Sequence, residues 1–78
     1  METPASVISV DAGVMSGAPV FRGTRVPIAG LFDYLAAADP LEAFLTDFPT
    51  VTRTMALALI REAGTELLAK YGVEWPEA

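Results

Sequence analysis

Residues 17–28 read Gly-Ala-Pro-Val-Phe-Arg-Gly-Thr-Arg-Val-Pro-Ile, and this stretch constrains the backbone more than any other part of the chain. Each of its two prolines fixes φ at about −65° and lacks an amide donor, whereas its two glycines permit positive φ. A helix is therefore excluded, and we expect short extended segments joined by tight turns. Val20–Arg22 is predicted to be a strand, and Gly23-Thr24 a turn with positive φ at the glycine.

The residues before this stretch predict a second strand and a loop. Val7–Val10 is a short β-branched run, which is typical of a strand. Asp11–Gly17 follows as a loop, because Gly13 and Gly17 interrupt regular structure. We expect a single domain, with strands and turns over residues 1–27, three helices over 28–71 and a tail over 72–78.

Apolar spacing predicts the first two helices, over residues 28–38 and 40–48. Asp39 is expected to be the N-cap of the second, with Pro40 at its first position and Glu42 completing a capping box. Both helices repeat the i, i+3, i+4, i+7 spacing of one buried face. The positions are Ile28, Leu31, Phe32 and Leu35, then Leu41, Phe44, Leu45 and Phe48.

The third helix is expected to begin near Thr50 or Thr52 and to run to about Tyr71. Gly72 then supplies a C-terminal stop, because glycine readily adopts the left-handed conformation that ends helices. At 100° per residue, the apolar residues of this helix fill an arc of roughly 180°, which is wider than one small core requires.

One edge of this arc is a candidate contact surface, made of Leu57, Leu68 and Tyr71. Either it packs under the N-terminal strands, or it meets a second chain, which is the interpretation we favour. We therefore expect a homodimer. Trp75, in the tail, either packs back on the helix or provides a further contact.

Composition limits the function. The chain has 78 residues, of which 53% are hydrophobic, and such a short chain is expected to bury apolar surface against a partner. It has no cysteine and no histidine, so a disulfide, a thiolate or a histidine base is excluded and a zinc site is not expected.

No apolar run is long enough to span a bilayer and no signal peptide is recognised, so we expect a cytoplasmic protein. The net charge of −5 argues against strong nucleic-acid binding and suits a basic protein partner.

No catalytic, cofactor or metal site is predicted. Glu62 and Glu66 are four residues apart on the third helix, and we interpret them as a solvated face. The glycines carry no phosphate-binding spacing. The chain is thus expected to be no enzyme and to take no small-molecule substrate.

A helix-turn-helix order provides an alternative function. A short second helix, a turn at residues 48–50 and a longer third helix resemble a DNA-binding unit whose last helix reads the groove. For Arg25 we favour a structural role, in which it pins its loop through carbonyl groups or the carboxylate of Asp33 or Asp47. The candidate nucleic-acid contacts are Arg22, Arg25, Thr52, Arg53 and Thr54.

The chain resembles domain-of-unknown-function family 433, small prokaryotic proteins of which many are described as antitoxins. The resemblance covers roughly residues 8–63. Its motifs are Gly17-x-Pro19-Val20-Phe21-Arg22-Gly23-Thr24-Arg25-Val26-Pro27, Asp39-Pro40-x-Glu42 and Phe48-Pro49-Thr50-Val51-Thr52. Two departures are Ala38, where the family has glycine, and Arg53-Thr54, where it has acids.

The resemblance implies a mainly α fold, a homeodomain-like, helix-turn-helix-like trihelical bundle with a short N-terminal β element. It also implies a non-catalytic antitoxin of a type II toxin–antitoxin pair, which binds and neutralises a PIN-like ribonuclease toxin. The alternative that it leaves open is a dimeric transcriptional regulator that binds its own operator DNA. With so few basic residues, we expect any such DNA binding to be weak and strongly dependent on salt.

Overall fold

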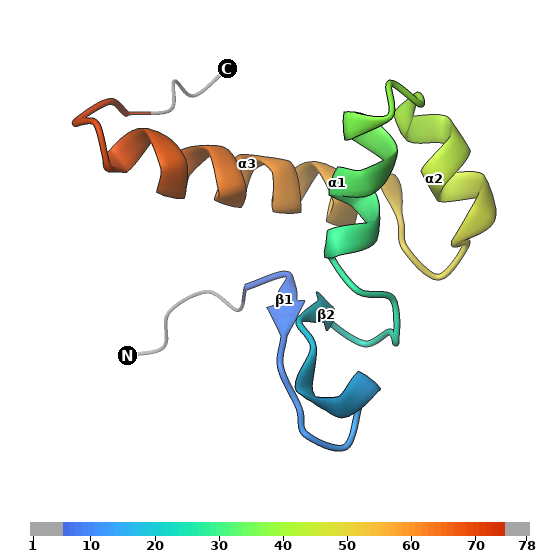
Figure 1. The fold of residues 1–78 in the computed structure, drawn as a ribbon. Coiled ribbons are helices and arrows are strands. Elements are labelled where there is room, and N and C mark those ends of the chain that lie inside the picture. Colours follow the sequence, from blue (N-terminus) through green and yellow to red (C-terminus); the bar gives the residue numbers. More distant parts are fainter. Residues whose placement is uncertain (1–5, 75–78) are drawn as a thin grey trace.

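The computed structural model describes residues 6–74, and helices dominate it (Figure 1). Three helices follow a short N-terminal β element, as the sequence predicts. The elements are β1 (Ile8–Ser9), the short turn η1 (Met15–Gly17), β2 (Val20–Phe21), α1 (Ala29–Ala36), α2 (Leu41–Asp47) and α3 (Arg53–Ala69).

The proline- and glycine-rich stretch forms a tight hairpin around Gly23. Gly23 has a φ of 80°, which confirms the predicted positive value. The Thr24 amide donates to the Phe21 carbonyl at 2.9 Å across the turn, and the Phe21 amide donates to the Val26 carbonyl at 2.9 Å. On its other side β2 pairs with β1 in antiparallel register, with Ile8 opposite Phe21. The hairpin thereby holds Phe21 in the middle of the β element.

The core lies where β2 meets all three helices. Phe44 of α2 is fully buried and its ring centroid lies 6.0 Å from that of Phe21, 5.3 Å from Tyr34 and 4.9 Å from Phe48. The buried residues of this cluster are Phe21, Leu31, Phe44, Val51, Ala56 and Leu59. The predicted apolar face of the second helix is confirmed, since all four of its residues are buried or pack against the cluster.

The predicted buried face of the first helix is only half right. Leu31 is fully buried, but Phe32 and Leu35 are 39% and 38% exposed. Tyr34 packs in their place, with its ring edge-on to Phe44 and Phe48. The buried side of α1 therefore includes Tyr34, because this side lies against Phe44 of α2 and Phe48 after it.

The predicted capping box at the start of the second helix is wrong. The N-cap is Pro40, whose side chain has no acceptor, and the helix starts at Leu41. The amide of Asp39 donates instead to the Tyr34 carbonyl at 2.9 Å, so Asp39 belongs to the turn that ends α1. Glu42 is then free to bond Arg53 of α3.

The same turn ends α1 and α3, but with different residues at its left-handed position. After α1 this position is Ala38, with a φ of 67°, and after α3 it is Gly72, with a φ of 74°. In each turn the next residue donates back five positions, from Asp39 to Tyr34 and from Val73 to Leu68. The predicted stop at Gly72 is confirmed, and Ala38 adopts the strained conformation in a position that usually holds glycine.

Ala38→Gly is expected to stabilise the protein by about 1 kcal/mol, because glycine adopts positive φ without strain. Glycine also raises the entropy of the unfolded chain, but this opposing effect is smaller than the strain that is removed. The measurement is urea unfolding of the two proteins. Gly72→Ala, the reverse change in the matching turn, should destabilise by a similar amount. A loss of stability in Ala38→Gly would contradict this account of the turn.

Candidate protein-binding surface

The residues predicted to contact nucleic acid at the start of α3 have structural partners. Thr52 is the N-cap, and its hydroxyl accepts from the Met55 amide at 3.1 Å. Arg53 donates to the carboxylate of Glu42 on α2 and forms an ion pair with it. The hydrogen bond and the positive charge of Arg53 lower the pKa of Glu42. Thr54 is exposed beside them.

Arg22, and not Arg25, pins the N-terminal segment. Its Nε donates to the Ser6 carbonyl at 2.7 Å and an Nη to the Ile8 carbonyl at 2.8 Å. Arg25 is exposed and forms no ion pair with Asp33 or Asp47. The structural role expected for Arg25 therefore belongs to Arg22, because antiparallel pairing brings the β1 carbonyls to the residue after β2.

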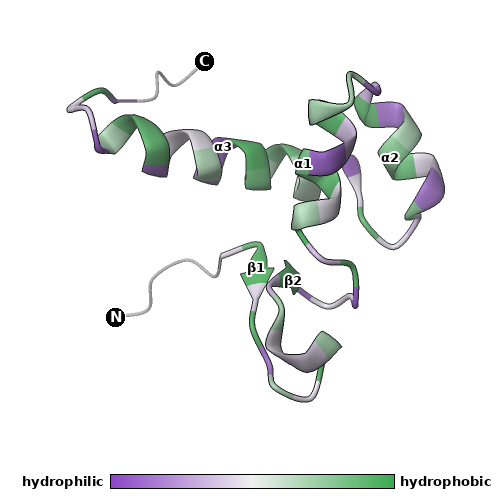
Figure 2. Ribbon diagram, in the orientation of Figure 1, coloured by the Kyte–Doolittle hydropathy of each residue, from purple (hydrophilic) through white to green (hydrophobic). Residues whose placement is uncertain are grey.

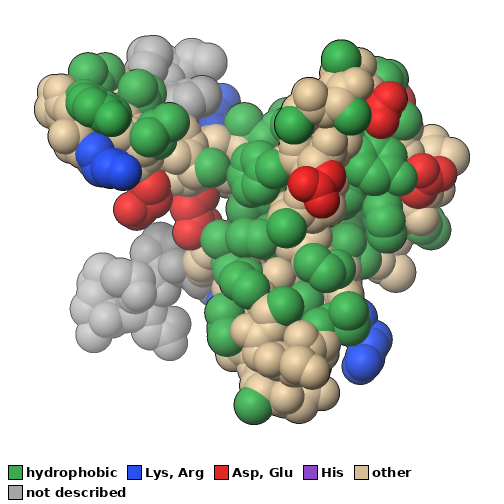
Figure 3. Space-filling model, in the orientation of Figure 1, with side chains coloured by type: hydrophobic (Ala, Val, Ile, Leu, Met, Phe, Trp, Pro, Cys, Tyr) green, Lys and Arg blue, Asp and Glu red, His purple; other side chains and the backbone are tan. Residues whose placement is uncertain are grey.

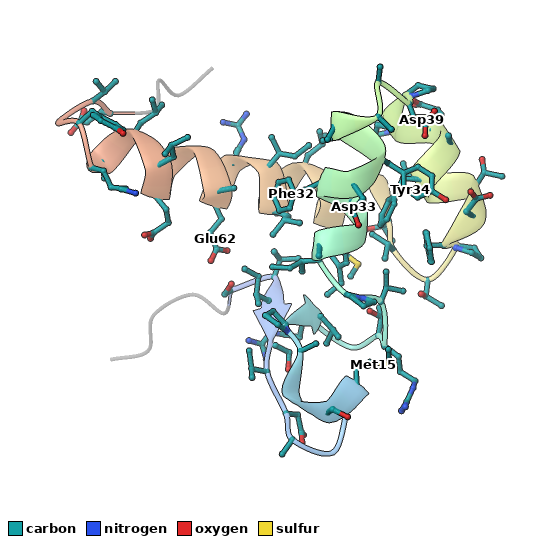
Figure 4. The ribbon with its side chains drawn as sticks, viewed as in Figure 1. Met15, Phe32, Asp33, Tyr34, Asp39 and Glu62 are labelled. Carbon is teal, nitrogen blue, oxygen red and sulfur yellow. The ribbon has the colours of Figure 1, made fainter. Side chains whose placement is uncertain are left out.

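Two further contacts, which sequence reasoning missed, hold the acidic side chains of Glu62 and Asp47. The Ser6 hydroxyl donates to Glu62 of α3 at 2.8 Å, and Figure 4 shows Glu62 pointing from α3 towards β1. The Tyr34 hydroxyl donates to Asp47 at 2.5 Å. This hydrogen bond, more than burial or the charges of Asp47 and Asp39, raises the pKa of Tyr34. Both pairs are distant in sequence, so no local pattern predicts them.

An apolar line, exposed at Leu57 and again at Leu67 and Tyr71, runs along α3 and just past its C-terminal end. In Figure 1 the C-terminal half of α3 extends away from the other helices, and Figure 2 shows hydrophobic residues along it. The two fully buried residues of α3, Ala56 and Leu59, are both in its first half. Beside them runs a line that we call the α3 seam, with Leu57, Ile60, Gly64 and Leu67 on α3 and Tyr71 just after its end. Its exposed members are Leu57, Leu67 and Tyr71, whereas Gly64 is half-buried and Ile60 packs against the core.

The α3 seam contains two of the predicted contact residues and one that was missed. Leu57 is 46% exposed and Tyr71 is 74% exposed, as a contact surface requires. Leu67 is 55% exposed, and it was not predicted as a contact residue. Its position three residues after Gly64 and four before Tyr71 is the signal that could have identified it. Leu68 is half-buried, and Trp75 lies outside the described residues. The predicted homodimer stays a prediction.

Apolar side chains also reach the surface on α1. Phe32 and Leu35 are partly exposed, and Figure 4 shows Phe32 pointing from α1 towards α3. Figure 3 shows hydrophobic side chains over α1, the adjoining part of α3 and the β element, with one acidic group among those over α1 and others at their margins. This surface is open and suits a macromolecule better than a small ligand.

Within residues 6–74 there is no pocket and no group of three or more side chains that could hold a metal ion. None of the helices in this part of the chain has both the length and the apolar character needed to cross a bilayer.

Comparison with known proteins finds a family match that covers most of the chain but ends before Gly64, Leu67 and Tyr71 of the α3 seam. A family model described as "Protein of unknown function (DUF433)" matches residues 8–63, from β1 into the middle of α3. No curated protein and no solved structure matches the chain.

Proposed function

The chain belongs to the DUF433 family, and from its own surface we propose that it is a non-catalytic, antitoxin-like module that binds and neutralises a PIN-like ribonuclease toxin. The observation that carries this proposal is the exposure of Leu57 and Leu67 on one side of α3 and of Tyr71 just after its end. Large apolar and aromatic side chains aligned on an open surface are the usual anchors of a protein interface.

The charge of the chain supports a protein partner that acts on RNA. A ribonuclease must attract phosphates, and its RNA-binding surface is therefore expected to be basic. The chain has a net charge of −5, and exposed acids such as Asp33 and Glu66 are not taken up by ion pairs among the described residues. Opposite charges speed the encounter, and the apolar anchors then hold the complex.

A DNA-binding regulator is the second candidate function. Its support is the order of α2, a short turn and α3, with Thr52, Arg53 and Thr54 all exposed at the start of α3. We rank it second because Arg53 already pairs with Glu42 and the Thr52 hydroxyl already caps α3. Such contacts leave fewer donors for phosphates and base edges.

The test of the first proposal is co-expression with the protein encoded beside this chain in its native host. The full-length chain is expected to relieve the growth arrest that this neighbour causes and to co-purify with it. Leu67→Glu should weaken the complex about 30-fold or more, because truncation of an interface anchor typically costs at least about 2 kcal/mol.

Ala69→Glu is the matched control, since it adds the same charge at an exposed position on the opposite side of α3. It should leave growth rescue and co-purification unchanged, and both variants should melt like the parent protein. If the unmodified chain neither rescues growth nor binds its neighbour, the antitoxin proposal is wrong and the regulator becomes the preferred function.

A further inference from the structure

The α3 seam has the spacing of a helix-pairing surface. Its residues follow each other at steps of three, four, three and four, so Leu57, Gly64 and Tyr71 occupy the a positions of a heptad and Ile60 and Leu67 the d positions. Gly64 lies in the middle, where the lack of a side chain lets a second helix approach closely. The seam is therefore shaped for an α-helix rather than for a strand or a loop.

The charges beside the seam have one sign. The flanking e position of the first heptad is Arg61, and the flanking g position of the second is Lys70. Both are exposed, and the ion pair formed among the described residues is between Arg53 and Glu42, so no described acid engages them. Two of the few cations of an acidic chain thus border its exposed apolar line.

A second copy of the chain, which the sequence pattern favours as the partner of this edge, fits the seam poorly once its flanking charges are considered. In a homodimer each helix would present the same flanks, and the charged members of both flanks are cations. Arg61 and Lys70 would then meet only each other or neutral residues across the contact. Each copy also carries a net charge of −5, which opposes the approach of two copies.

We propose that the α3 seam receives an amphipathic helix of a partner protein, with an apolar stripe that is bordered by Asp or Glu. Leu57, Leu67 and Tyr71 pack against the stripe, and Arg61 and Lys70 pair with the acids on its two sides. This deepens the proposed function, because it specifies what the bound protein offers to α3. The acidic surfaces elsewhere on the chain remain for the basic region of the same partner.

Two synthetic helical peptides test this inference with the full-length chain. Both carry the same leucine stripe at a and d, but one has Glu and the other Lys at the flanking positions, and binding is followed by fluorescence anisotropy. We expect the Glu-flanked peptide to bind at least tenfold more tightly, with a preference that shrinks as salt screens the charges. The net charge of the chain alone favours the Lys-flanked peptide, so this preference reports on Arg61 and Lys70.

Matched variants locate the preference. Arg61→Glu should remove most of it, whereas Arg25→Glu, the same change at an exposed position on the hairpin, should leave it intact. Circular dichroism melting of both variants checks that the fold is kept. A preference that survives Arg61→Glu together with Lys70→Glu would show that these residues do not set it.

Equal binding of the two peptides, tighter binding of the Lys-flanked one, or binding of neither would overturn the proposal. So would light scattering that finds a dimer of the chain which Leu67→Glu dissociates, because a second copy would then occupy the seam. The co-expression test is independent of these results, since growth rescue does not require that flanking charges choose the helix. Failure of the peptide preference alone therefore leaves the proposed function standing.

Discussion

Replacing Phe44 with alanine is expected to lower the free energy of unfolding by about 3–5 kcal/mol. The Phe44 side chain is fully buried, and its ring packs against Phe21 from the β element, Tyr34 from α1 and Phe48 beyond the end of α2. Alanine would leave a cavity at the point where these elements meet. A domain of this size rarely has more than about 3–5 kcal/mol of net stability, so we expect most of the variant to be unfolded at room temperature.

Phe32→Ala is the control for this prediction, because it removes the same ring from a partly exposed site on α1. Its cost should be below about 1 kcal/mol, since surface substitutions seldom cost more. Circular dichroism in urea measures both variants. Similar losses in the two would show that Phe44 is not the centre of the core.

Local patterns predict the parts of this fold that local chemistry determines. The spacing of Leu41, Phe44, Leu45 and Phe48 identifies the buried side of α2, because a short helix between two others has one face to bury. Gly72 ends α3 for the reason expected of a glycine after an apolar helix. In these places the residue and its neighbours in sequence are sufficient.

The predictions that failed concern features that contacts between distant parts of the chain determine. Asp39 has the chemistry of an N-cap, but its amide bonds back to Tyr34, and the helix starts after Pro40. Arg22 and Arg25 are the same residue type in the same short stretch, so the sequence does not distinguish their roles. The pairing of β1 with β2 places Arg22 beside the carbonyls of Ser6 and Ile8.

The candidate surface was predicted only in part for a related reason. Periodicity identifies the apolar side of the third helix and hence Leu57 and Tyr71. It carries no information on how far along α3 the other elements reach, and this extent is what leaves Leu67 exposed. The charges of Arg61 and Lys70 indicate a partner only once the α3 seam is known, because the structure is needed to show that these residues lie on either side of it.

Gly23→Val is expected to destabilise the protein by about 2 kcal/mol, and so to lower its melting temperature by about 8–16 °C. Gly23 has a φ of 80°, which a β-branched residue adopts only with strain. A Cβ at this position would meet no atom within 4 Å, so the cost comes from the backbone and not from a clash. The measurement is thermal unfolding followed by circular dichroism.

Two control variants separate backbone strain from the loss of contacts in this hairpin. Gly23→Asn should cost much less than valine, because asparagine tolerates the left-handed region and the site has room for its side chain. Arg22→Ala removes two hydrogen bonds from an exposed guanidinium group and should cost about 1 kcal/mol, less than Gly23→Val. If valine and asparagine lower the melting temperature equally, the side chain at this position matters and its φ does not. If Gly23→Val melts like the parent protein, the turn does not need a glycine, and the stretch at residues 17–28 is held by its prolines and by Arg22 instead.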